Sequence, residues 1–172
     1  AVFPTHRVLT GLKDPDLVDR LKRGIEGAFE TVAEGELDPA GLEGVGCFGL
    51  LLADGTRQLL RLLDPSSLDA LFSDRSPAYR ELDAAILEKV VFSETLGMSE
   101  SDVEAKRGLS YARTVEEATA AVESGEAQAA FILRATPIEQ VRAVADAGET
   151  MPPKSTYFFP KIPTGIVFNP LS

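Results

Sequence analysis

Apolar residues recur along this chain with the period of strands in some stretches and of helices in others. Residues 2–10 carry β-forming side chains on both sides of Pro4, which predicts a strand interrupted at the proline. Asp14 and Pro15 are typical of a helix start, and an apolar stripe with helical spacing follows as far as Gly35. The stripe consists of Val18, Leu21, Ile25, Phe29 and Val32. This spacing predicts an amphipathic helix packed on a sheet.

The clearest turn signal is the dipeptide Asp54-Gly55. It separates two apolar runs, residues 48–53 and 57–63. Asp-Gly readily adopts the positive-φ conformations of a type I′ turn, which joins antiparallel strands. We therefore expect a β-hairpin here.

A second long helix is predicted from Ser76-Pro77 to Gly97. Its apolar stripe is wide enough to be buried on two sides and consists of Tyr79, Leu82, Ile86, Leu87, Val90, Val91 and Phe92. The polar residues 99–108 that follow indicate a connector or a short exposed helix.

The last third of the chain alternates regularly between strand and helix patterns. Strands are predicted at 109–112, 127–133 and 165–168, and helices at 114–124 and 136–147. Each helix begins with the spacing of a capping box and ends before a glycine. The boxes are Thr114 with Glu117 and Thr136 with Glu139.

These elements predict an α+β or α/β fold, with a mixed sheet flanked by helices. The hairpin must be antiparallel, whereas helical crossovers permit parallel neighbours. The length of 172 residues suits one domain over residues 1–172.

The net charge and the cysteine content bear on which partners and which cellular compartment suit the chain. A formal net charge of -10 disfavours nucleic-acid binding, because a polyanion would meet a repulsive field. Cys47 is the only cysteine, so an intrachain disulfide is impossible and a cytoplasmic setting is the simplest. The apolar runs are too short to cross a membrane, so no membrane partner is expected.

The Pro-rich segment at 151–161 has the least ordinary composition in the chain. Its spacing from Gly148 onward is similar to a P-loop, but Pro153 lacks the N–H that a phosphate-binding loop needs, and no helix pattern follows. Two interpretations stay open. Lys154, Ser155 and Thr156 could bind an anionic group, or the loop could seal the core with its aromatic residues.

His6 is the only histidine, and with Arg7 it belongs to the first predicted strand. It could act as a base or as a ligand anchor, or it could be an ordinary packed residue. One histidine and one cysteine cannot assemble a usual zinc site, so no metal site is predicted, although a carboxylate-bound Mg²⁺ stays compatible with the sequence. Cys47 fits a small buried side chain better than a reactive thiol. The sequence names no catalytic residue and no cofactor.

Both unusual segments carry a family resemblance. Residues 3–9 (FPTHRVL), 151–161 (MPPKSTYFFPK) and 165–170 (GIVFNP) resemble the uncharacterised bacterial domain-of-unknown-function family ten-fifteen. Proteins of that family are longer and carry an upstream Asp-Gly-His-His-Arg signature, similar to that of ParB-like and sulfiredoxin-like nucleotide-using proteins. The turn at 54–57 (DGTR) is not that signature. The resemblance implies that the chain is a carboxy-terminal fragment and that its missing amino-terminal domain is a partner.

Two functional hypotheses follow. In the first, the chain supplies half of a composite site for a small anionic ligand, a nucleotide or a phosphorylated metabolite. His6, Arg7, Lys154, Ser155 and Thr156 are then the candidate binding residues. In the second, the domain is structural or docks a protein partner. We expect the first strand and the Pro-rich loop to meet if the first hypothesis holds.

Overall fold

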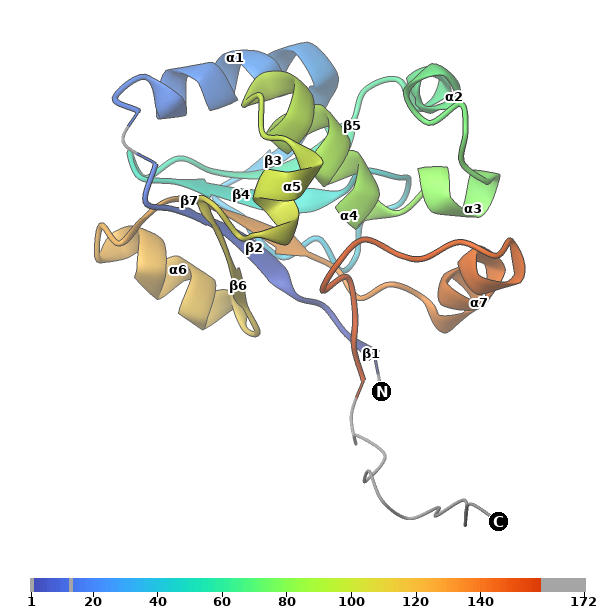
Figure 1. The fold of residues 1–172 in the computed structure, drawn as a ribbon. Coiled ribbons are helices and arrows are strands. Elements are labelled where there is room, and N and C mark those ends of the chain that lie inside the picture. The colour runs from blue at the N-terminus through green and yellow to red at the C-terminus, as the bar shows by residue number, and fades with distance from the viewer. Residues whose placement is uncertain (1, 13, 159–172) are drawn as a thin grey trace, which may run out of the picture.

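The computed structural model describes residues 2–12 and 14–158 and has a six-stranded sheet at its centre (Figure 1). In spatial order the strands are β3 (Phe29–Glu34), β5 (Arg57–Leu62), β4 (Phe48–Leu52), β7 (Ala127–Leu133), β2 (His6–Thr10) and β6 (Leu109–Ala112). A separate two-stranded ribbon pairs β1 (Val2–Phe3) with β8 (Tyr157–Phe158).

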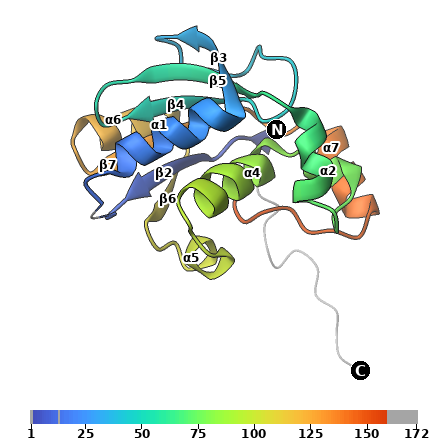
Figure 2. The same ribbon diagram turned by 90° about the horizontal axis from the view of Figure 1, so that it is seen from above.

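Helices cover both faces of the sheet (Figures 1 and 2). The helical segments are α1 (Leu17–Ala28), η1 (Pro65–Ser67), α2 (Leu68–Leu71), α3 (Pro77–Arg80), α4 (Asp83–Ile86), the π-helix η2 (Leu87–Thr95), α5 (Glu100–Glu104), α6 (Val115–Glu123) and α7 (Ile138–Asp146). The larger core lies between the sheet and α1 with η2, and a smaller core lies under α6. Because successive strand residues face opposite ways, Leu9 joins the first core and Val8 the second.

The larger core is built around aromatic rings in edge contact. Phe48 lies 5.0 Å from Phe29 and 5.8 Å from Phe131, and Phe131 lies 5.5 Å from Phe92, measured between ring centroids. Such edge-to-face pairs stabilise a core beyond the area that they bury. These ring contacts connect β3 with β4, β4 with β7, and β7 with η2.

The predicted α+β class is confirmed, with the hairpin of β4 and β5 antiparallel around Gly55 at a φ of 88°. Parallel neighbours were also expected, but every pairing between the described strands is antiparallel. The reason is the place of β2. It lies between β6 and β7, so the crossover through α6 joins two strands of equal direction that are not adjacent.

The first predicted helix is correct in its buried face and wrong in its length. Leu21 and Ile25 are buried as expected, but the helix ends at Ala28 and residues 29–34 form the edge strand β3. Val32, which the helical stripe included, is 39% exposed. The β-branched Thr31 and Val32 suit a strand, and pairing with β5 satisfies the backbone there.

The second predicted helix is divided into α3, α4 and η2. Ser76 caps α3 as its hydroxyl accepts from the Tyr79 N–H, and the extended backbone of Leu82 separates α3 from α4. Hydrogen bonds of π type follow, as from the Leu96 N–H to the Val91 carbonyl. Gly24 of α1 approaches this segment so closely that an added Cβ would lie 2.3 Å from Thr95 Cγ2.

Strand and helix alternation in the last third is confirmed with small corrections at the helix starts. The Thr114 hydroxyl caps α6, but the Glu117 carboxylate accepts from the Arg113 N–H in place of the Thr114 N–H. α7 begins after Pro137, so Thr136 is not its cap. The polar segment forms the short helix α5, and the predicted strand at 165–168 lies outside the described residues. No helix in the described parts of the chain is long and apolar enough to span a bilayer.

Candidate functional site

Arg7 joins the first strand to the Pro-rich loop, as the sequence led us to expect. Its side chain is fully buried, with an exposed fraction of 0%. The guanidinium donates hydrogen bonds to the carbonyl oxygens of Thr5 at 2.7 Å, Pro153 at 3.2 Å and Lys154 at 3.2 Å. Its fourth bond is to Glu88 Oε1 of η2, at 3.2 Å. One side chain thus holds three segments that are distant in sequence.

The surroundings of this ion pair have low polarity. Burial raises the pKa of the Glu88 carboxyl, and the charge and hydrogen bond of Arg7 partly oppose this shift. The ring of Tyr111 lies 5.2 Å from the Arg7 guanidinium carbon, in reach of a cation–π contact. Arg7 Nε is buried without a hydrogen-bond partner. The arrangement is therefore held mainly by the two terminal nitrogens.

The loop that Arg7 holds has an uncommon backbone conformation. Lys154 has a φ of 57°, in the left-handed region that residues other than glycine rarely adopt, and its side chain is exposed. Ser155 is buried, and its hydroxyl donates to the Pro152 carbonyl at 2.6 Å. Thr156 is half-buried, just before β8. Lys154 is thus the member of the predicted set that meets solvent most freely.

His6 does not share this site. Its Nδ1 accepts a hydrogen bond from the Leu133 N–H at 3.1 Å, and the side chain is only 3% exposed. Burial, helped by the Arg7 charge, lowers its pKa, so the neutral ring is favoured. As the strand neighbour of Arg7, His6 faces the α6 side of the sheet, whereas Arg7 faces η2. The structure therefore brings Arg7 together with the loop residues Lys154, Ser155 and Thr156. His6 lies on the opposite face of the sheet.

Glu88 was not among the residues predicted from the sequence. It lies within the apolar stripe of the second predicted helix, where a single acidic residue gives no special signal. With Pro152 and Pro153 it lines a cavity of about 350 Å³ beside the loop. Only the fold reveals this neighbourhood.

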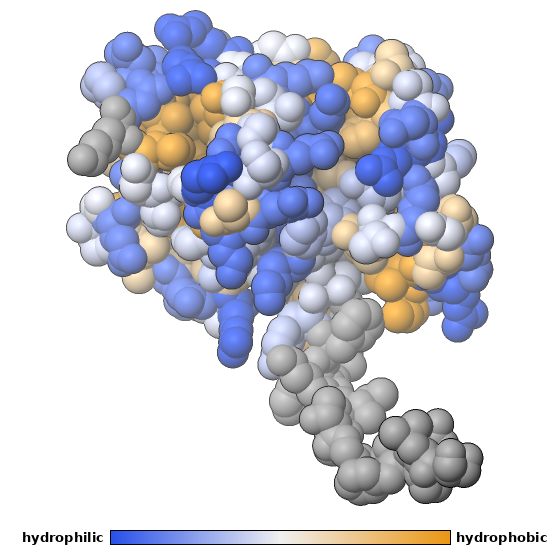
Figure 3. All heavy atoms as spheres, viewed as in Figure 1, coloured by the Kyte–Doolittle hydropathy of each residue, from blue (hydrophilic) through white to orange (hydrophobic). Residues whose placement is uncertain are grey.

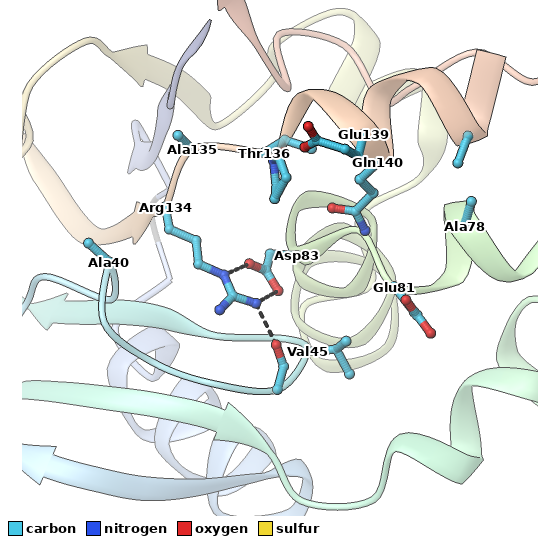
Figure 4. A pocket seen from close by; sticks show the side chains of 13 residues that line it. Ala40, Val45, Ala78, Glu81, Asp83, Arg134, Ala135, Thr136, Glu139 and Gln140 are labelled. Carbon is cyan, nitrogen blue, oxygen red and sulfur yellow. Dashed lines mark hydrogen bonds and ion pairs between the residues drawn. The ribbon is translucent and has the colours of Figure 1, made fainter.

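A second cavity, of about 650 Å³, lies between α7 and the loop that precedes β4 (Figure 4). Arg134 points across it and is bound by both carboxylate oxygens of Asp83 and by the carbonyls of Leu42 and Gly44. These bonds occupy the guanidinium, and they fix the loop to α4. Arg134 therefore has a structural role here and little capacity left for an anion.

The remaining reactive candidates do not form a site. Cys47 is buried, and burial raises the pKa of its thiol, which disfavours the reactive thiolate. Within residues 2–12 and 14–158, no group of three or more His, Cys, Asp or Glu could hold a metal ion.

Few large apolar side chains are exposed on the surface that the described residues present. Hydrophilic residues cover most of the face shown in Figure 3, and hydrophobic residues gather there in a few small patches. The large apolar side chains exposed in the described residues come from four separate segments and are Phe3, Val32, Leu63 and Ile138. Single exposed apolar residues are normal on soluble domains.

Comparison with known proteins shows similarity only at the level of solved structures. No family model and no curated protein matches the chain. A conserved hypothetical protein from Pyrococcus furiosus is 21% identical with a TM-score of 0.53, over 94% of this chain and 57% of that one. Free serine kinase in complex with AMP is 22% identical with a TM-score of 0.48, over 91% of this chain and 52% of that one. The chain thus spans about half the length of the structures that it matches, and at these identities the likeness concerns the fold alone.

Proposed function

We propose that the loop at 152–156 is the anion-binding part of a small-molecule site whose ligand is a nucleotide or another phosphorylated metabolite. Lys154 supplies the charge, and Thr156 supplies a hydroxyl donor. Arg7 and Ser155 act as scaffold, because their polar groups already bind the loop backbone. His6 has no part in this revised site.

The observation that carries the proposal is that the buried Arg7 binds the backbone carbonyl of the exposed Lys154. Burial of a guanidinium opposes folding by several kcal/mol unless its hydrogen bonds and charge are satisfied. Here the bonds fix the carbonyls of Pro153 and Lys154, and the Lys154 backbone is kept in a disfavoured conformation. A loop fixed in advance loses less entropy on binding.

The electrostatics support an anionic ligand. No carboxylate in the described parts of the chain forms an ion pair with Lys154, although acidic residues outnumber basic ones by 27 to 17 over the whole chain. Among the described residues, the ion pair that Arg7 forms is with Glu88, which is therefore already bound. Lys154 therefore forms a local positive point on an acidic domain.

We propose further that the chain is the carboxy-terminal part of a longer protein of family ten-fifteen, and that another segment of that protein completes the site. The support is the likeness of residues 3–9 and 151–161 to that family and the short coverage of the Pyrococcus furiosus structure. The two family-like segments meet at Arg7 and the loop.

The test is a thermal-shift titration of the full-length protein with inorganic phosphate, AMP and glucose phosphate, with adenosine as the probe that lacks phosphate. We expect at least one phosphate-bearing probe to raise Tm and adenosine to have no effect, because ligand binding to the folded state alone stabilises it. Lys154→Ala should weaken that binding by about tenfold, which corresponds to ~1.4 kcal/mol.

Lys106→Ala is the matched control. Lys106 is also an exposed lysine with a left-handed backbone, at a φ of 55°, so both substitutions change charge and backbone preference alike. Equal effects of the two variants, or no shift with any phosphate-bearing probe, would overturn the proposal and favour a structural or protein-docking role.

A further inference from the structure

A small apolar groove lies against the two-stranded ribbon of β1 and β8, and Figure 1 shows β1 below the six-stranded sheet. Its volume is about 280 Å³, and it is lined by Phe3, Pro4, Arg113 and Tyr157. Small-molecule sites usually occupy ~300–1,000 Å³, so the groove has room for a compact group such as one ring system. Three rings and one guanidinium make up this lining.

The pairing of β1 with β8 places two aromatic side chains on the same face of the ribbon. Phe3 is directly opposite Tyr157 in the antiparallel register. Residues in such a pair share a face and have Cβ atoms ~4.5–5.5 Å apart. Phe3 is 46% exposed, whereas Tyr157 is half-buried. The Phe3 ring is therefore accessible to a ligand in the groove.

Arg113 lines the groove from the connection between β6 and α6. Its guanidinium carbon lies 5.4 Å from the centre of the Tyr157 ring. The backbone at this position is fixed, because the Arg113 N–H donates to the Glu117 carboxylate at 2.8 Å. Arg113 is exposed, so a guanidinium that stacks on Tyr157 with one face can meet a second ring with the other. Proteins commonly bind nucleobases by stacking them on aromatic rings and guanidinium planes.

The groove adjoins the loop at 152–156. Tyr157 follows Thr156 directly and lies three residues after Lys154, so at most about 11 Å separates the Cα atoms of Lys154 and Tyr157. The lysine side chain and the ribose of a nucleotide together can bridge this distance. Among the described residues, the lining of the groove holds one cation and no carboxylate. A phosphorylated ligand therefore meets no repulsion from the lining, although the domain as a whole is acidic.

We infer that this groove binds the base of a nucleotide whose phosphate is bound at Lys154, an inference that rests on the function proposed above. The base stacks against the Phe3 ring and the Arg113 guanidinium. The groove thus narrows the ligand from phosphorylated metabolites in general to nucleotides, because a sugar phosphate has no flat apolar group to place there.

The test is isothermal titration calorimetry of the full-length protein with AMP, GMP and UMP. Ribose 5-phosphate, which has the sugar and the phosphate but no base, is the matched probe. We expect at least one nucleotide to bind about tenfold more tightly than ribose 5-phosphate, because only a nucleotide can stack in the groove. Equal affinity for all four probes would overturn the inference and leave the anion site intact. Absence of binding by all four would refute the proposed function and this inference with it.

Variants locate the base. Phe3→Leu and Arg113→Met remove the flat groups and keep apolar bulk, so each should weaken nucleotide binding by at least about threefold. Their affinity for ribose 5-phosphate should equal that of the parent, which also shows that the variants are folded. Leu63→Ala, at an apolar position that is 60% exposed, is the control and should change neither affinity. A preference for the nucleotide that survives both groove variants would place the base elsewhere and refute the assignment.

Discussion

Replacement of Arg7 by Met tests whether the buried ion pair organises the fold around the Pro-rich loop. The substitution removes the counter-charge of Glu88, whose side chain is only 16% exposed, and the donors to the carbonyls of Thr5, Pro153 and Lys154. Loss of one partner of a buried pair costs ~3–5 kcal/mol, because the other charge stays desolvated. The hydrogen bond to the Lys154 carbonyl is only partly buried, so water can replace part of it, and we expect a loss of ~3–5 kcal/mol in total.

Urea denaturation followed by circular dichroism measures this loss, and the double variant Arg7→Met/Glu88→Gln separates its causes. Neutralisation of Glu88 should recover ~1–3 kcal/mol relative to Arg7→Met alone, because the unpaired charge is gone, while the carbonyls still lack their donor. The pair does not organise this region if the free energy of unfolding of Arg7→Met stays within ~1 kcal/mol of the parent. The same conclusion follows if the stability losses of Arg7→Met and of Glu88→Gln alone add up to the loss of the double variant.

Two further predictions concern the sheet. The pKa of His6 is lowered from 6.5 in the folded protein, so its contribution to stability is complete above pH 6.5 and is lost as the pH falls toward the folded pKa, with a slope of at most ~1.4 kcal/mol per pH unit. His6→Asn keeps an acceptor for the Leu133 N–H and should flatten this dependence; an unchanged slope in urea midpoints measured from pH 7.5 to pH 5 would show that another group is responsible. Gly49→Ala should cost at least ~1–3 kcal/mol, since its Cβ would lie 2.0 Å from the Leu37 carbonyl oxygen, and a thermal melt equal to that of the parent would show that this approach can relax.

The candidate site could be predicted only in part. Composition singled out the Pro-rich loop and the strand with Arg7, and the two segments do meet. The sequence could not show that the Arg7 side chain would be buried against the loop backbone, or that the Lys154 side chain would be exposed to solvent. The exclusion of His6, however, could have been foreseen, because adjacent residues of a strand face opposite sides of the sheet.

Local signals alone determined the hairpin at Asp54-Gly55, the strands β6 and β7, and the starts of α3 and α6. These features depend on turn preference, capping and periodicity, which act within a few residues of the chain. Tertiary structure decided the rest. Residues 29–34 became a strand because β5 offers an edge to pair with, β2 entered the sheet between β6 and β7, and Glu88 became the partner of Arg7. Each of these outcomes depends on contacts between segments far apart in the chain, whose free energy no local pattern of residues records.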